Sequence, residues 1–584
     1  MNQFSIPFLS LVVLSSSVFA QDNPAEKTNT DSLKMDVTFV GEREMVVKDA
    51  LKLQSWPELR KLENSKKDFA YRLLAKRMNV SPVWSMIEPV RLRVDAPLSR
   101  LYRGYARAGY GLNNTPLLEV SFTDLRSREG TWGFHGSHFA TNAPLGLVDE
   151  RFKDSKAGIW ISRFIGKERV DFSADLSRKN IVFYGNAEND SLPPLNDFGT
   201  HERYITVGAD VAFKSHHRDS TDLNHEIALR WFQMRDLQST VENNYEGSFN
   251  AGKFVGKEHF SLSGYMNIDR LVIGANNPDT VETDPADAAI VSITPMVTSF
   301  RGPLTVRVGA GLWIDADQQS RKGDGSTFHF YPKVEASLRV LRDVFVPYIS
   351  LDGRLDQNRL ETVVRDNPFY YSSLDSEFRT TSISREIEIG MRGTITEALS
   401  FQVFGSSAHY EDYMYFVNDA MLDSGTRFST FYDTLTVTKI GGHLTLDLID
   451  NLDLRLAGTL FKYDENGLAN AWNLPSAKWS VEASYGFLEK FKVDCAVEII
   501  GSRSALTQVR PTPDAEPIMQ DGEINSYAVK LPSYIDANIG VEYRYNSRTA
   551  VWLRCSNVTN SSYRNWVGYP VQRFQALFGA SYAF

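Results

Sequence analysis

Apolar and polar residues alternate with a period of two through most of the chain after about residue 97. Successive side chains of an extended strand point to opposite faces, so this pattern is typical of strands with one apolar face. In the closing segment RFQALFGASYAF, every second residue back from Phe584 is apolar. Similar segments span residues 205–213, 304–314, 385–393, 479–487 and 534–545. The alternation predicts an all-β fold.

These segments are long, and their apolar sides carry no Asp, Glu, Lys or Arg. Strands of soluble sandwiches average about 5 or 6 residues, whereas a tilted strand that crosses a bilayer needs about 9 to 11. A charged side chain on the lipid side near the bilayer midplane costs about 2–4 kcal/mol. Together, length and the missing charges predict a transmembrane antiparallel β-barrel whose apolar sides face lipid.

Short and long connections alternate between the predicted strands. Short polar turns such as LIDNLDL, FLEKFK and RYNSRT contrast with long polar segments such as NAENDSLPPLND, NNPDTVETDPADA and the stretch from Ser504 to about Val529. Short turns on one rim, long loops on the other and an even strand number are typical of bacterial outer-membrane barrels. Residues 97–584 are therefore the predicted barrel, with about 22 strands expected within a range of roughly 18 to 24.

The first twenty residues predict a signal peptide, because an apolar run ends in small residues before a cleavage site at Gln21. Residues 21–96 are then a predicted periplasmic extension. Beyond the signal, no stretch of the sequence approaches the roughly 18 continuous apolar residues of a membrane helix. The net charge of −9 argues against a nucleic-acid partner.

Only two cysteines occur, Cys495 and Cys555. The alternation places both on the lipid side with one strand between them, about 10 Å apart at roughly 4.8 Å per strand. A disulfide needs Cα atoms within about 7 Å of each other. Both cysteines are therefore predicted to be small lipid-facing residues without a disulfide.

The C-terminal stretch LRCSNVTNSSYRNWVGYPVQRFQALFGASYAF resembles the end of TonB-dependent outer-membrane receptors. An Asn-x-Thr-Asn-x-x-Tyr run closes the penultimate strand, an aromatic-Pro loop follows, and the last strand ends in Phe. The matching residues are Asn557, Thr559, Asn560, Tyr563, Tyr569, Pro570 and Phe584. The terminal strand also resembles the signal read by the outer-membrane insertion machinery, carried by Phe574, Phe578, Tyr582 and Phe584.

The region before the barrel departs from that family, whose members carry a globular plug there. Residues 21–96 leave no room for a four-stranded plug, so the chain resembles a plugless variant of the kind associated with the Bacteroidetes. Within this region, Asp36, Val37, Thr38, Phe39 and Val40 form an extended TonB-box-like segment that the resemblance links to an energising partner. The alternatives are a strand of a small periplasmic subdomain or a disordered leader.

Candidate chemistry in the sequence is sparse. The pairs His135/His138 and His216/His217 point apart on strands or turns, so no metal site is predicted. No hydrolase motif is present, and neither an enzyme nor a cofactor is expected. Aromatic segments at residues 367–373 and 565–570 lie in connections, where they fit either ligand contacts or the membrane rim.

The polar sides of the strands carry charges of both signs. These residues are expected to pair across neighbouring strands, with a ligand path as the alternative. They are Asp210, Arg307, Glu386, Glu388, Arg392, Asp536, Glu542 and Arg544.

Two functions follow from these expectations. The resemblance implies uptake of a solute across the outer membrane of a Gram-negative cell, in contact with outer-membrane lipid and a TonB-like energiser. The alternative is a structural or assembly scaffold whose barrel is occluded by a partner protein. An open barrel of about 22 strands would leak because its lumen is wide, so both functions predict that a partner or the N-terminal region blocks it.

Overall fold

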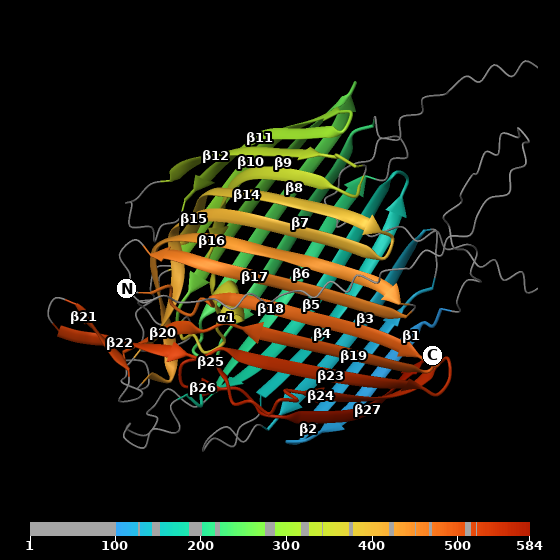
Figure 1. The fold of residues 1–584 in the computed structure, drawn as a ribbon, viewed down its shortest axis with the longest axis vertical. Coiled ribbons are helices and arrows are strands. Elements are labelled where there is room, and N and C mark those ends of the chain that lie inside the picture. Colours follow the sequence, from blue (N-terminus) through green and yellow to red (C-terminus); the bar gives the residue numbers. More distant parts are fainter. Residues whose placement is uncertain are drawn as a thin grey trace, which may run out of the picture. The chain divides into compact units, whose positions relative to one another are not determined.

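The computed structural model describes the barrel region (Figure 1). The described residues are 101–125, 129–142, 152–185, 201–215, 222–274, 286–316, 326–341, 343–372, 378–419, 425–449, 451–465, 470–508, 515–520 and 523–584. The predicted signal peptide, the extension at 21–96 and the segment at 36–40 lie outside the described residues. So do His216 and His217.

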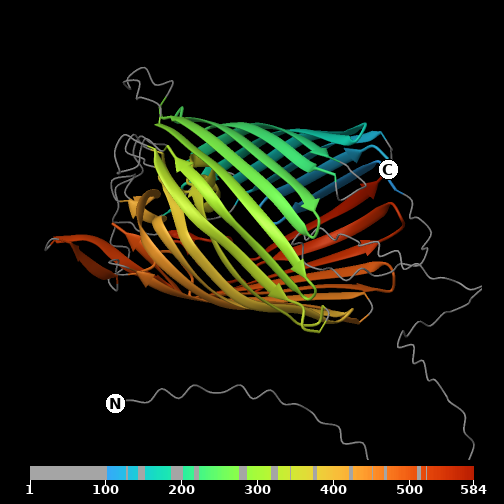
Figure 2. The ribbon, with the colours of Figure 1, turned by 90° about the horizontal axis from the view of Figure 1, so that it is seen from above.

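Twenty-two strands close into one antiparallel barrel, as predicted (Figure 1 and Figure 2). They are β1 (Gly104–Gly111), β2 (Thr115–Thr123), β3 (Gly130–Thr141), β4 (Phe152–Ile165), β5 (Glu168–Val182), β6 (His201–Ser215), β7 (Asn224–Arg235), β8 (Val241–Val255), β9 (Glu258–Val272), β10 (Ala286–Arg301), β11 (Leu304–Asp315), β12 (Thr327–Leu338), β13 (Val346–Gln357), β14 (Thr380–Thr396), β15 (Leu399–Asp419), β16 (Arg427–Ile449), β17 (Leu452–Glu465), β18 (Ala477–Phe487), β19 (Phe491–Ile500), β23 (Tyr534–Arg544), β24 (Thr549–Ser556) and β27 (Gln575–Ala583). Each pairs with its neighbour in this order.

The barrel closes where the first strand meets the last. β1 pairs with β27 in register from Tyr105 opposite Ala583 to Gly111 opposite Leu577. Beyond that ladder, the Gly104 N–H donates to the Phe584 carbonyl and the Phe584 N–H to the Gly104 carbonyl, each at 2.9 Å. Closure leaves no free edge at this seam, as hydrocarbon surroundings require.

One tryptophan fills the inner side of the seam. Trp552 on β24 is 3% exposed, and its ring lies against two glycines of the adjoining strands. A Cβ at Gly109 or at Gly579 would come within 2.5 Å or 2.3 Å of that ring. The Arg107 guanidinium covers the ring from the lumen, 4.0 Å from its centroid. Glycine at both positions gives the indole the space it needs.

The outward faces of the strands are apolar and exposed, as the alternation predicts. On β27, Phe578 is 63% exposed whereas its neighbour Leu577 is 4% exposed. The same side of the barrel carries exposed Val207, Val308 and Ile389. Large apolar side chains exposed in such numbers fit hydrocarbon rather than water.

The inward faces carry the predicted charges, and several of them pair. Asp210 lies 3.5 Å from Arg230, and Glu386 lies 3.3 Å from Arg354. On β23, Arg544 lies 3.0 Å from Glu542. These pairs support the expectation of mutual pairing across or along the strands.

The cysteines lie as predicted. Cys495 on β19 is opposite Ile539 on β23, and Ile539 is in turn opposite Cys555 on β24. One strand therefore separates them, and both are free.

The two ends of the barrel differ. At one end, tight turns join strands, for example at Gly166 and Gly256, which both have positive φ. At the other end, the connections are long, and one of them is itself a sheet. Within the stretch expected as a polar loop after Ser504, the chain forms β20 (Arg503–Thr507), β21 (Glu516–Gln520) and β22 (Glu523–Leu531). This extension continues β19 and β23 beyond the barrel (Figure 1).

Two further elements lie in long connections at that end. A helix, α1 (Leu360–Asp366), lies between β13 and β14, and the small strands β25 (Arg564–Trp566) and β26 (Tyr569–Pro570) lie between β24 and β27. Among the described residues, no helix is long and apolar enough to cross a membrane.

The outward face of β7 offers a test of its surroundings. A lysine at Leu229, which is 54% exposed on that face, is expected to lower the free energy of unfolding by about 2–4 kcal/mol because the charge enters hydrocarbon. Urea titration in lipid vesicles measures this change. The matched control is Ala228→Lys, one residue away on the lumen face, where the loss is expected to stay below about 1 kcal/mol. Equal losses would contradict the assignment of the two faces.

Candidate functional site: the lid at the long-connection end

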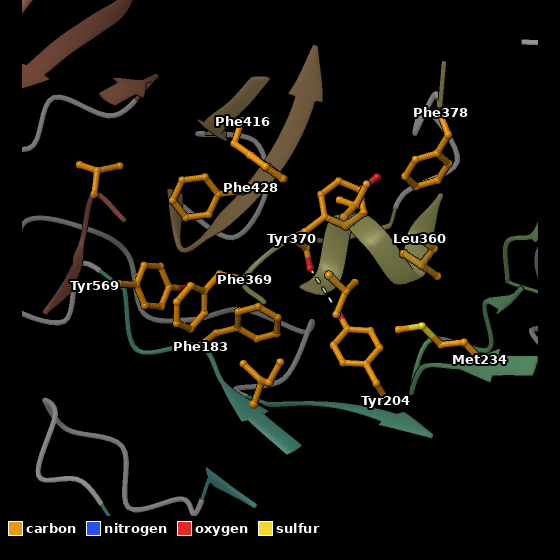
Figure 3. Close-up of a cluster of buried hydrophobic side chains, with 14 of the residues drawn as sticks. Phe183, Tyr204, Met234, Leu360, Phe369, Tyr370, Phe378, Phe416, Phe428 and Tyr569 are labelled. Carbon is orange, nitrogen blue, oxygen red and sulfur yellow. Dashed lines mark hydrogen bonds between the residues drawn. The ribbon is translucent and has the colours of Figure 1, made fainter. Parts of the chain in front are cut away.

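Two long connections turn inward and fill the end of the barrel from which they start. We call residues 358–372, which include α1, and residues 564–570 the lid. Apolar side chains of α1 pack on inward-facing residues of β6, β7 and β9, among them Tyr204, Phe232 and Leu271 (Figure 3). The helix has buried residues at i, i+3 and i+4, namely Leu360, Val363 and Val364, which give it one apolar face.

A buried carboxylate of the wall holds the start of α1. Glu242 on β8 is fully buried, and its Oε2 accepts a hydrogen bond from the Glu361 backbone N–H at 3.0 Å. The residue at the usual capping position, Arg359, makes no side-chain cap. Since a carboxylate near a helix N-terminus is favourable, Glu242 supplies in trans the cap that the local sequence lacks.

Aromatic rings join the two parts of the lid. Phe369 and Tyr569 stack with ring centroids 3.6 Å apart and planes at 19°. Tyr184 meets Tyr569 edge to face at 4.9 Å and donates its hydroxyl to the Pro570 carbonyl at 2.9 Å. The Tyr569 hydroxyl donates to the Thr426 carbonyl. Residues from four connections are thus held against one another.

A fully buried arginine lies beside this stack. The Arg427 guanidinium lies 4.3 Å from the ring centroid of Phe183 and 4.4 Å from that of Tyr371. The next residue, Phe428, exchanges backbone hydrogen bonds of 3.1 Å with the lid at Phe369 and Tyr371. Desolvated cation–π contacts of this kind contribute about 2 kcal/mol or more.

Acidic groups complete the underside of the lid. The Ser372 hydroxyl donates to Asp236 at 3.0 Å, and the Thr240 backbone N–H donates to the same carboxyl at 2.7 Å. Burial raises the pKa of Asp236, although these hydrogen bonds favour its charged form. Burial also raises the pKa of Asp366 at the end of α1, with the nearby Arg365 acting in the opposite direction. Burial thus favours the protonated form of both carboxyls.

The lumen wall nearer the short turns is charged and hollowed. A hollow of about 430 Å³ there is lined by Arg455, Glu482, Lys492 and Asp494, among others. Both signs of charge are present, so this part of the path favours polar, hydrated solutes over apolar ones.

The first residues of the C-terminal motif lie just before the second part of the lid. Asn557 has φ 48° and is 5% exposed; its side-chain amide donates to the carbonyls of Ser561 at 2.8 Å and Gln572 at 3.1 Å. Thr559 donates to the Asn557 side-chain oxygen at 3.1 Å. Asn560 accepts a hydrogen bond from the Phe574 N–H at 3.3 Å. These bonds tie the start of the connection to its end.

The remaining motif residues pack against neighbouring side chains or strands. Tyr563 stacks on Tyr534 with ring centroids 3.8 Å apart, and Tyr569 and Pro570 form the strand β26 against β25. The terminal aromatics Phe574, Phe578, Tyr582 and Phe584 lie on the exposed side, between 38% and 63% exposed. Their role as an insertion signal stays a prediction.

The histidines lie as expected from the alternation. His135 points to Asp175, with Nε2 to Oδ1 at 3.7 Å, whereas His138 on the other face contacts the Ser155 hydroxyl at 2.8 Å. Within the described ranges, no group of three or more His, Cys, Asp or Glu side chains is placed to hold a metal ion.

Removing the hydrogen-bond acceptor at Glu242 is expected to loosen α1. In Glu242→Leu, the Glu361 N–H loses its partner at a cost of about 1 kcal/mol, which raises cleavage within residues 358–372 by limited proteolysis about fivefold. Glu246→Leu, on the same face of the same strand, is the control and leaves the cleavage rate unchanged. Equal rates for the two variants would show that Glu242 does not hold the helix.

The motif residue Asn557 is expected to stabilise the barrel through its side chain. Asn557→Ala loses the four hydrogen bonds of the side chain and places alanine at positive φ, so the free energy of unfolding falls by about 1–3 kcal/mol in urea titration. Asn557→Gly loses the same bonds without backbone strain, and a smaller loss is expected. An alanine variant as stable as the glycine variant would argue against the strain.

No protein-family model matches the sequence, and no curated protein matches it either. Solved structures match the fold over most of the chain. The FrpB iron transporter from Neisseria meningitidis has a TM-score of 0.60 at 10% identity and covers 83% of this chain and 82% of its own.

Two further solved structures match similarly. A variant of the ferric enterobactin receptor PfeA from Pseudomonas aeruginosa has a TM-score of 0.57 at 11% identity, covering 82% and 80%. The ferric-catecholate import receptor Fiu from Escherichia coli has a TM-score of 0.56 at 11% identity, covering 83% and 82%. At these identities the likeness concerns the fold: this chain folds as a 22-stranded barrel similar to those of outer-membrane siderophore receptors.

Proposed function

We propose that this protein takes up a solute across the outer membrane through a barrel that its own lid closes. The observation that carries the proposal is the lid itself. A wide barrel needs an obstruction, and here the obstruction includes two connections that return to the wall they came from. Because each segment is attached to the barrel wall at both of its ends, it can move aside and return, as a gate requires.

The long connections face the cell exterior in this proposal, because bacterial barrels place short turns on the periplasmic side. The lid is then the first part of the protein that an incoming solute meets. The similar structures are described as an iron transporter, a ferric enterobactin receptor and a ferric-catecholate import receptor. Ferric chelates are therefore the first solutes to test.

The missing plug and the energising partner are also part of the proposal. Residues 21–96 are too few for a four-stranded plug, and the segment Asp36–Val40 would engage a TonB-like partner. Deleting residues 21–96 and testing for loss of a co-purified partner shows whether this region recruits the energising partner.

A structural or assembly scaffold is the second candidate, and the sheet extension β20–β22 favours it. In the described part of the chain, β21 pairs only with β22, so its outer edge is open to a partner strand.

Planar-bilayer conductance tests the gate. The native protein is expected to give low conductance, and Phe369→Ala with Tyr569→Ala is expected to raise it at least tenfold, because the stack that joins the two parts of the lid is lost. The matched control is Phe487→Ala with Phe491→Ala, a stacked pair at 5.0 Å on the short-turn rim. A silent lid variant would favour the scaffold. A change of the same size in the control would show that lost stability, not gating, causes it.

A further inference from the structure

Four cations lie on the outward face of β4–β7, near the long-connection end. Lys153, Arg178, Arg203 and Arg235 each share the outward side of their strand with an exposed apolar residue nearer the middle. Those residues are Ile159, Leu176, Val207 and Leu229. We call the four the cationic rim.

The strand register brings the four together. Asn180 lies opposite both Lys153 and Arg203 on its two neighbouring strands. Ile205 lies opposite both Arg178 and Arg235. Each cation of the rim is therefore the diagonal neighbour of the next, and diagonal neighbours lie about 7–8 Å apart.

Among the residues that the structure describes, no carboxylate neutralises this concentration of positive charge. Arg178 donates to Asn180 at 3.3 Å and Arg235 to Gln233 at 3.0 Å, both neutral amides. The Arg203 Nε is buried with no hydrogen-bond partner. In the part of the chain that the structure describes, none of the four forms an ion pair, whereas Arg270 on β9 lies 3.7 Å from Asp287. Like charges side by side are unfavourable, so an anion bound at the rim would stabilise the described part of the barrel.

The position of the rim restricts what that anion can be. The next outward positions along β4 and β7 are the polar Ser155 and Gln233, and one or two positions further the outward side is apolar, with Ile159 opposite Ala174 and Ala209 opposite Trp231. The cations thus lie beyond the end of the apolar band, at the level expected for lipid headgroups. The corresponding ends of β11 and β12 carry Ile314 and Phe328 instead, so the rim is a local feature.

We propose that the cationic rim binds the phosphates of an anionic lipid in the outer leaflet. Arginine binds phosphate oxygens bidentately and with charge, and clustered basic residues at this depth attract anionic headgroups. The apolar residues below the rim would contact the acyl chains of the same lipid. The inference rests on the proposed orientation in the outer membrane, with the long connections outside.

Native mass spectrometry of the full chain in detergent, with added bisphosphorylated lipid A as the probe, tests this. The native protein is expected to retain lipid A through detergent exchange, and Arg178→Gln with Arg203→Gln is expected to reduce retention at least tenfold. Lys153→Gln with Arg235→Gln provides a second variant of the rim. Dephosphorylated lipid A is expected to bind at least tenfold more weakly, and inorganic phosphate is expected not to displace the lipid.

The matched control removes two outward cations from the short-turn ends of the same sheet, Arg163→Gln with Lys253→Gln, and is expected to retain lipid A. Migration on SDS gels before and after heating shows that each barrel is folded. Equal retention by the rim variants and the control, no preference for phosphorylated lipid, or displacement by inorganic phosphate would each overturn the proposal. Retention is measured without transport, so a silent lid variant with retained lipid would count against the proposed uptake function alone.

Discussion

Every backbone amide in a hydrocarbon environment must find a partner within the protein, because no water is present to replace it. Because of this requirement, the twenty-two strands close into a barrel, and the pairing of β1 with β27 is essential. The ladder across the seam is short, from Tyr105 to Gly111 on β1. The indole of Trp552, set on two glycines and covered by Arg107, adds side-chain packing where the ladder alone joins the two ends of the barrel.

A circle of this size encloses more space than the wall residues can fill, and this explains the character of the lid. The lid forms a small apolar core with aromatic rings at its centre. Charged and acidic side chains next to this core are held by specific partners. Arg427 and Glu242 are fully buried. Buried polar groups stabilise when their partners are in place and destabilise when the partners leave, so these contacts add specificity to the apolar packing of the lid.

The sequence predicted the barrel well because the two sides of each strand meet different surroundings. Apolar residues at every second position, as in residues 205–213, follow directly from lipid on one side and a lumen on the other. The strand number, the cysteine positions and the unequal ends agree with the structure. The strands within the connection after Ser504 were not predicted, because they are short and the brief alternation at Tyr527, Val529 and Leu531 follows a polar stretch that contains Pro and charged residues.

The lid was beyond prediction for a different reason. Its helix has only seven residues, too few for a helical period to stand out. The aromatic segments around Phe369 and Tyr569 were recognised as connections of interest, but no local pattern encodes which connections meet across a lumen. Obstruction by a partner or by the N-terminal region was expected, and the contribution of the barrel's own connections was not. The C-terminal motif was recognised by resemblance, and its hydrogen bonds give that resemblance a physical basis.

The seam tryptophan has a consequence for biogenesis. Its ring is enclosed by residues from near the beginning and the very end of the barrel sequence, so a nascent chain cannot complete this niche until the last segment has docked. A partly inserted intermediate would leave the indole exposed to water, without its contacts to the two glycines. One side chain thus distinguishes a closed barrel from an open sheet.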